Sequence, residues 1–311
     1  MADPIKIQFR PGINRETTDY GNSGGWYDCN LARFQGGVPE SMAGWQKFTS
    51  AAMQGTQRSL FPWSTLNGSR YYGVGTNLKY YVIRGNFPND VTPIRASSTI
   101  NNNPFAIVSG SATATVTDTS HGAVVGDFVT FSGAASIGAS NVTAAVLNRE
   151  YQIVTVVNAN SYTITLTVTS DTTDAVGGGA SVVAAYQISV GLDTTATGNG
   201  WGTGPWGNNG WGSGSSTFVE TDQLRLWTED NFGEDLLFNV RNGGVYYKDM
   251  SANIADRAVN ITSLTGSSGA PTVARQVLIS DNDRHIIAFG VNEIGSSTQD
   301  PLLARWATSE S

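Results

Sequence analysis

Short apolar runs separated by turn residues dominate the hydrophobic and polar pattern of this chain. Apolar runs at 60–63 and 70–75 are followed by a Thr76-Asn77 turn and by a third run at 78–83. Two apolar runs that flank a tight turn are typical of a β-hairpin. The arrangement recurs at 235–249, around Asn242-Gly243, and again at 285–306. The pattern therefore predicts strands joined by tight turns.

These three imperfect copies predict blade-like units. Leu236 and Ile286 hold corresponding positions in the second and third copies, 286 − 236 = 50 residues apart. Known blade repeats run to about 40 to 50 residues. A β-propeller is the predicted architecture, and unrelated hairpins within a sandwich are the alternative.

The segment between the first and second copies, residues 105–190, has a different character and is rich in Ala, Val, Thr and Gly. Within 162–169 every even position is apolar and every odd one is threonine, which predicts a strand with one buried face. Further strands are predicted at 127–131, 151–157 and 180–186. We expect an inserted β-sandwich or small barrel of about 85 residues.

Two segments lack such strands. Residues 1–50 are punctuated by Pro and Gly and predict an extended arm. Residues 191–217 form a Gly-rich loop in which Trp201, Trp206 and Trp211 recur every five residues. The chain is thus predicted to be all-β, with propeller blades at 51–104 and 218–311 that flank the inserted domain and this loop. We expect this propeller to be incomplete or truncated, because the last blade reads as unfinished.

Composition narrows the functional classes. Charged residues make up only 14% of the chain, and 36 of its 311 residues are glycine, as in many assembled β proteins. The net charge of −7 argues against a protein that grips nucleic acid, although an acidic wall lets DNA slide past. A single cysteine, Cys29, excludes an intramolecular disulfide, and no apolar stretch is long enough to span a membrane.

Candidate catalytic chemistry is sparse. The two histidines, His121 and His285, are expected to be structural or surface residues, and no nucleotide-binding motif occurs in a strand-turn-helix context. A carboxylate pair for glycoside cleavage is conceivable among Glu220, Asp222, Glu229, Asp230, Glu234 and Asp235. Solvated loop acids are the simpler interpretation. A calcium ion at Asp230-Asn231 or at 281–283 would lack the usual twelve-residue loop, so no catalytic, cofactor or metal residue is predicted.

Several segments resemble structural proteins of bacteriophages. They are 11–16 (PGINRE), 24–28 (GGWYD), Gly44-Trp45, 119–122 (TSHG) and 126–131 (GDFVTF). The resemblance is to the tail hub or nozzle proteins of short-tailed phages, the β-propeller type of tail accessory or stabilisation protein. The resemblance covers most of the chain, but its motifs are typical of assembly and carry no catalytic signature.

The resemblance implies a virion protein assembled in the host bacterial cytoplasm, commonly as a hexameric ring below the portal and adaptor. The genome leaves through such a ring, and tail fibres or spikes attach around it. Members of this family are usually longer, and 304–311 reads like an unfinished blade. We therefore expect either a longer product or completion of the open edges by neighbouring subunits.

The leading hypothesis is a non-enzymatic structural subunit of a phage tail. Its predicted interface residues are spaced aromatic and apolar side chains of the arm and the Gly-rich loop: Phe9, Ile13, Trp26, Tyr27, Trp45, Trp201, Trp206 and Trp211. The alternative is a carbohydrate-binding module in which the three loop tryptophans stack on glycans of the host surface. A hydrolase that uses the acidic residues above is the third hypothesis.

Overall fold

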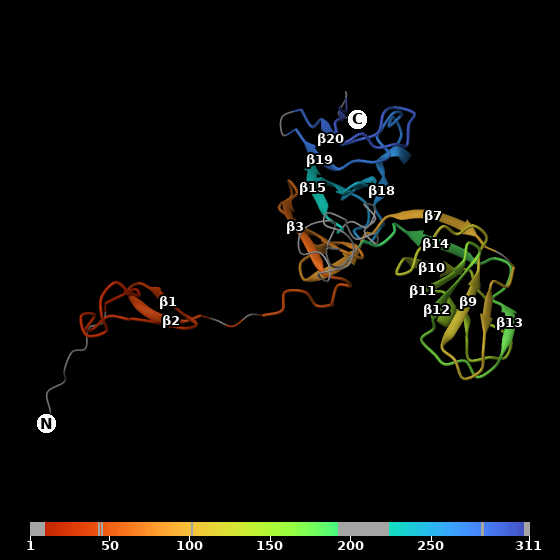
Figure 1. Ribbon diagram of the computed structural model, residues 1–311, viewed down its shortest axis with the longest axis horizontal. Helices are drawn as coiled ribbons and strands as arrows, with labels where there is room; N and C mark the ends of the chain where they lie inside the picture. Colours follow the sequence, from red (N-terminus) through yellow and green to blue (C-terminus); the bar gives the residue numbers. More distant parts are fainter. Residues whose placement is uncertain are drawn as a thin grey trace, which may run out of the picture. The chain divides into compact units, whose positions relative to one another are not determined.

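The protein is built almost entirely of β-strands. A computed structural model describes residues 10–42, 44, 46–100, 102–191, 224–280 and 283–307, and the chain divides into two compact units at residues 48 and 49 (Figure 1). Helical structure in the described part is confined to two short turns, α1 (Ala144–Leu147) and the 3-10 turn η1 (Ile261–Ser263). The prediction of an all-β fold is confirmed.

The N-terminal unit contains one antiparallel hairpin, β1 (Ala32–Gln35) and β2 (Val38–Ser41). Gly36 and Gly37 form its turn with φ of 60° and 83°, in the left-handed region that glycine adopts without strain. Ahead of the hairpin, Ile13 and Trp26 form an isolated parallel bridge. Side chains along both strands are half-buried at most.

The second unit begins with a four-stranded antiparallel sheet whose strands follow one another in chain order. They are β3 (Gln57–Ser64), β4 (Arg70–Thr76), β5 (Tyr80–Arg84) and β6 (Phe87–Asp90). The turn between β4 and β5 is tightened by the Thr76 hydroxyl, which accepts hydrogen bonds from the amides of Leu78 and Lys79 at 3.1 and 2.8 Å. This is the first hairpin that the sequence predicts.

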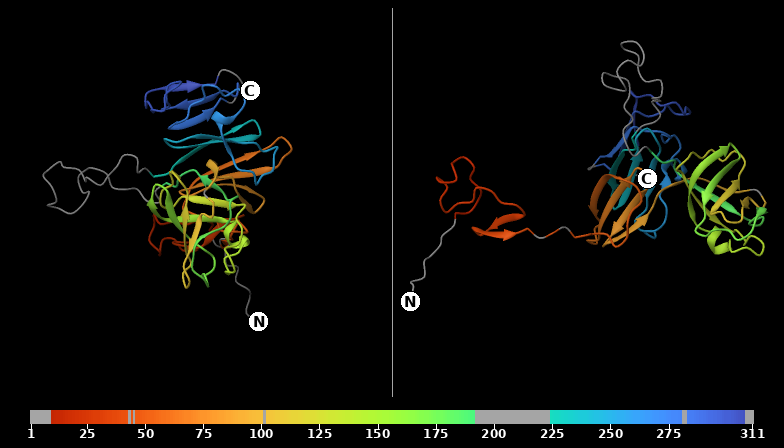
Figure 2. Two further views of the ribbon diagram at one scale, coloured as in Figure 1. Left: turned by 90° about the vertical axis from the view of Figure 1, so that its right-hand side faces the viewer. Right: turned by 60° about the horizontal axis from the view of Figure 1, so that its bottom comes forward.

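An eight-stranded antiparallel sheet follows, in the order β13-β8-β9-β12-β11-β10-β14-β7. Figure 2 shows its yellow and green strands gathered into one lobe, here called the inserted domain. The sheet includes an edge strand, β7, that lies ahead of the predicted boundary at residue 105. Its strands are β7 (Ile94–Thr99), β8 (Phe105–Ile107), β9 (Thr113–Thr117), β10 (Phe128–Ser132), β11 (Glu150–Asn158), β12 (Ser161–Thr165), β13 (Asp174–Gly177) and β14 (Val183–Gln187).

The core of the inserted domain comes from alternate residues of these strands. In β12 and just beyond it, Tyr162, Ile164 and Leu166 are buried, while the intervening threonines face outward to varying extents. β11 pairs first with β10 and then with β12, with register shifts after Ile153 and Val156. Such shifts bend a strand, so the sheet curves around its own core.

Two further antiparallel sheets complete the second unit. One has four strands in chain order, β15 (Trp227–Phe232), β16 (Asp235–Val240), β17 (Val245–Lys248) and β18 (Val259–Asn260). The other has three, β19 (Gln276–Ile279), β20 (Ile286–Phe289) and β21 (Ala304–Trp306). Asn242 adopts a φ of 56° in the turn between β16 and β17, which suits asparagine better than most residues.

The three chain-order sheets pack face against face in sequence. Between the first two, Tyr80 stacks on Phe238 with ring centroids 4.0 Å apart, and the Trp227 indole donates to the carbonyl of Thr76 at 2.8 Å. Between the last two, the Thr228 hydroxyl accepts from the amide of Val277 at 3.2 Å. Antiparallel sheets stacked in chain order are the way that propeller blades pack, and the closed propeller itself stays a prediction.

Candidate functional site

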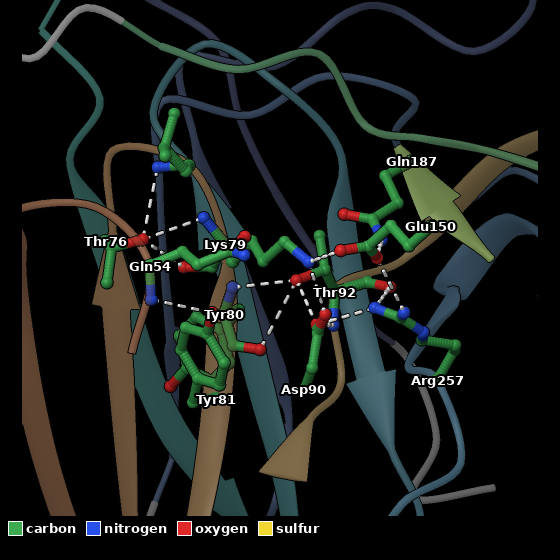
Figure 3. Close-up of polar contacts among 11 residues, drawn as sticks. Gln54, Thr76, Lys79, Tyr80, Tyr81, Asp90, Thr92, Glu150, Gln187 and Arg257 are labelled. Carbon is green, nitrogen blue, oxygen red and sulfur yellow. Dashed lines mark hydrogen bonds and ion pairs between the residues drawn. The ribbon is translucent and has the colours of Figure 1, made fainter. Parts of the chain in front are cut away.

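A ring of four charged side chains, here called the junction cluster, joins the inserted domain to the neighbouring sheets (Figure 3). It consists of Lys79, Asp90, Glu150 and Arg257. The Lys79 ammonium lies 2.8 Å from Asp90 and also pairs with Glu150. The Arg257 guanidinium lies 2.6 Å from Asp90 and 3.4 Å from Glu150. Each cation thus bridges both carboxylates, and the cluster is neutral as a whole.

Each member comes from a different piece of local structure. Lys79 immediately follows the Thr76 turn, and Asp90 ends β6, where it accepts hydrogen bonds from the Thr92 amide at 3.0 Å and hydroxyl at 2.6 Å. Glu150 opens β11 of the inserted domain, and Arg257 lies ahead of β18. The cluster therefore connects three sheets that are distant in sequence.

Further contacts attach the cluster to the inserted domain. The Gln187 side chain, at the end of β14, donates to the Glu150 carboxylate. The Lys79 ammonium also lies 4.4 Å from the centroid of the Phe128 ring, a cation–π distance. The Lys79 side chain is only 3% exposed, so these partners must replace the water that would otherwise solvate its charge.

The electrostatics of the junction cluster favour the ionised form of Asp90. Burial by itself raises the pKa of Asp90, but the nearby charges of Lys79 and Arg257 outweigh burial, so this pKa lies below its usual value. Burial raises the pKa of Tyr81, beside the cluster, to about 12. With every charge compensated by another, the arrangement is suited to holding sheets together.

A buried aspartate fixes the two segments that connect the inserted domain to the rest of the unit. Asp127 accepts hydrogen bonds from the amides of Val124 and Val190, both at 3.1 Å, and from the Ser189 hydroxyl at 3.3 Å. The Arg95 guanidinium lies 3.7 Å from the same carboxylate. Asp127 thus anchors the root of the inserted domain.

The predicted interface residues that the structure describes lie in the N-terminal unit. Ile13 is 48% exposed and Tyr27 is 45% exposed. The Trp26 ring packs edge-on against Phe34 at 6.1 Å, and Arg15 forms an ion pair with Asp28 at 2.6 Å. Phe9, Trp45, Trp201, Trp206 and Trp211 lie outside the described residues, so their roles, and the glycan-binding hypothesis built on the last three, stay predictions.

Four of the six acidic residues considered for hydrolysis contact neighbouring sheets or loops. Glu229 accepts from the Ser59 hydroxyl of β3, and Asp230 accepts from the Ile279 amide of β19 at 2.8 Å. Glu234 accepts from the amide of Leu66, and Asp235 from that of Met250 at 2.7 Å. Through these hydrogen bonds the four carboxylates hold neighbouring sheets and loops together. Glu220 and Asp222 lie outside the described residues.

Neither histidine lies in the junction cluster. His121 is buried, its Nδ1 accepts from the Ala123 amide at 3.0 Å, and its Nε2 lies 3.1 Å from the Asn158 carbonyl. This places the imidazole proton on Nε2. Among the residues described, no group of three or more His, Cys, Asp and Glu side chains could hold a metal ion, and no helix is long and apolar enough to cross a membrane.

Sequence reasoning did not identify the junction cluster. Lys79, Asp90, Glu150 and Arg257 belong to no motif, and each is an ordinary charged residue next to a turn or strand end. One weak signal was present, because charged residues make up only 14% of this chain. Where charges are scarce, those that flank buried strands are good candidates for paired, structural positions.

Comparison with known proteins gives few matches. No protein-family model matches the chain, and no curated protein matches it. Among solved structures, it is similar to one titled "Phage phi92 endosialidase", at 14% sequence identity and a TM-score of 0.25. The match covers 81% of this chain and 36% of that chain, so this chain spans about a third of the endosialidase's length.

Proposed function

We propose that this chain is a non-enzymatic structural subunit of a bacteriophage tail, which forms a hub or nozzle ring in the virion. In this role it lines part of the conduit for DNA ejection, contacts portal or adaptor proteins, and carries attachment sites for fibres or spikes. The proposal is supported by the resemblance of the segments quoted above and by the all-β fold.

The observation that carries the proposal is the apolar exposure of the N-terminal unit. Within 10–42 six large apolar side chains are at least 45% exposed, namely Ile13, Tyr20, Tyr27, Leu31, Val38 and Met42. Single exposed apolar residues are ordinary on protein surfaces. Here, however, no described residue of 10–48 belongs to a buried hydrophobic cluster. A segment of this kind stabilises an assembly by burying its side chains against a neighbouring subunit.

The charge of the chain suits a conduit. A ring of six copies at −7 each would repel the phosphate backbone, because binding to DNA requires clustered cations that displace counterions. DNA could then pass without being held. Ionic strength should affect passage little, in contrast to its strong effect on proteins that grip DNA.

The proposal is tested by the mass of the native assembly, measured by mass photometry on the full chain. We expect a closed ring near six copies. The double variant Ile13→Asp/Tyr27→Asp should shift the mass towards the monomer, while its circular dichroism spectrum stays unchanged. The matched control, Leu66→Asp/Leu302→Asp, alters two side chains of the second unit that are 96% and 95% exposed and should leave the ring intact. A monomeric wild type, or a ring that survives the first double variant, would contradict the proposal.

A further inference from the structure

A cavity of about 950 Å³ lies where the connection from the inserted domain meets the last two sheets. Its walls come from the described segments 124–125, 188–191, 224–225 and 240–244, together with Tyr246, Arg275, Gln299 and Pro301. The volume is within the range of pockets that bind small ligands.

Arg225 is the most unusual residue of this cavity. It is only 8% exposed, yet its Nε and Nη1 atoms have no hydrogen-bond partner among the described residues. Burying these two donors is costly, because they have lost their hydrogen bonds to water and gained none from the described part of the protein. Stacking of the guanidinium on the Trp227 ring, 5.4 Å away, offsets only part of that cost.

The backbone is shaped to admit this arginine. A Cβ atom on Gly191 would lie 2.2 Å from the Cβ and 2.9 Å from the Nε of Arg225, so a side chain at 191 would displace it. Only glycine at 191 therefore allows the guanidinium to reach its position on the cavity wall. This close approach indicates a built position for the charge.

No carboxylate among the described residues forms an ion pair with Arg225. Burial lowers the pKa of Arg225 to about 10, and Tyr246 and Asp127 oppose that shift, so the guanidinium is charged at neutral pH. Asp127 is the carboxylate that acts on Arg225, but the Asp127 oxygens already accept hydrogen bonds from Val124, Ser189 and Val190. Arg225 therefore has no anion of its own in the described part of the chain.

The cavity as a whole is basic. Arg241 and Arg275 line it together with Arg225, and no Asp or Glu occurs among the described residues of its wall. Three arginines around one cavity stand out in a protein of net charge −7 with 18 Lys and Arg in 311 residues. Guanidinium groups bind carboxylates and phosphates through paired hydrogen bonds.

We propose that this cavity binds the oxyanion group, carboxylate or phosphate, of a small ligand, with Arg225 as the buried donor and Arg241 and Arg275 as further cationic contacts. The inference does not depend on the proposed tail function. It assigns a ligand site to a protein that is otherwise proposed to act by its shape alone.

The test is thermal unfolding of the full chain with sodium phosphate or sodium acetate, against sodium chloride at equal ionic strength. A ligand at ten times its Kd should raise Tm by roughly 3 °C or more. A response to phosphate alone or to acetate alone identifies the group, and a response to both indicates a general oxyanion site. The proposal would be overturned if neither anion raised Tm at concentrations up to about 50 mM, which is on the order of the Kd of a weak site.

Substitutions make the test specific. Arg225→Met should abolish the anion response and at the same time raise Tm without anion, because it removes an unpaired buried charge. The control Arg149→Met makes the same charge change at an exposed site of the inserted domain and should keep the full response. A response that survives Arg225→Met would show binding elsewhere and overturn the proposal. The proposal would also be overturned if the anion response appeared only in the double variant Glu220→Gln/Asp222→Asn. One of these two carboxylates would then be the partner of Arg225 in the unmodified protein.

Discussion

Lys79 and Glu150 form an ion pair between the first four-stranded sheet and the inserted domain, although 71 residues separate them in sequence. The same Lys79 ammonium pairs with Asp90 of its own sheet at 2.8 Å, and Arg257, just ahead of β18, closes the ring. The position of the inserted domain thus depends on a small number of charged contacts, and these contacts can be tested one at a time.

Removal of the buried cation should have the largest effect. Lys79→Met leaves Asp90 and Glu150 facing each other with only Arg257 between them, so we expect the second unit to lose about 3 to 5 kcal/mol of unfolding free energy. Urea denaturation followed by tryptophan fluorescence measures the change. Lys47→Met, at an exposed position of the N-terminal unit, is the matched control and should change the free energy by less than about 0.5 kcal/mol. Equal midpoints for the two variants would show that the junction cluster contributes nothing.

The junction cluster should also make the protein sensitive to acid. The pKa of Asp90 is lower in the folded protein than in the unfolded chain, where it is about 3.9. Its stabilising contribution is therefore fully present above about pH 4 and is lost as pH falls through the folded value. Asp90→Asn should lower Tm at pH 7 and flatten the fall of Tm between pH 5 and the acid limit of solubility, both read by scanning calorimetry. An Asp90→Asn profile parallel to that of the wild type would argue against this role.

Glu229 should change the pH dependence of stability in the direction opposite to that of Asp90. Burial raises the pKa of Glu229 in spite of the hydrogen bond from Ser59, so the folded protein holds this proton more tightly than the unfolded chain. Stability therefore decreases as pH rises from the unfolded pKa through the folded one, and the ionised carboxylate is a net cost at pH 7. Glu229→Gln retains an acceptor for Ser59 and should raise Tm at pH 7 by a few degrees while having little effect near pH 4. A lower Tm at pH 7 would contradict this expectation, because it would mean that the ionised carboxylate stabilises the folded state.

Gly75 should tolerate no side chain. A Cβ atom there would lie 2.3 Å from Cδ1 of Trp227 and 2.6 Å from the Ser59 hydroxyl, between the first and second sheets. We expect Gly75→Ala to displace the Trp227 ring, weaken its bond to Thr76 and cost about 2 kcal/mol or more. Near-ultraviolet circular dichroism and the urea midpoint report the two effects. Gly44→Ala, where nothing lies within 4 Å, is the control, and equal behaviour of the two variants would contradict close packing at Gly75.

Much of the fold could be read from local sequence. The alternation at 162–169 predicts which side chains are buried: Tyr162 and Ile164 of β12, and Leu166 just beyond it, are indeed inside. The Asn242-Gly243 pair predicts the turn between β16 and β17, where Asn242 takes the left-handed conformation. Both predictions succeed because strand periodicity and turn chemistry depend on neighbours in the chain.

The tertiary structure alone decided which charges meet. Asp90 and Arg257 are 167 residues apart, Glu150 and Arg257 are 107 apart, and no spacing rule connects them. The structure likewise buried Arg225 against Gly191 and gave Glu229 and Asp230 structural partners in other sheets. Side-chain alternation and turns are set by the few residues around them, whereas ion pairs and cavities depend on how separate sheets pack, which local sequence does not encode.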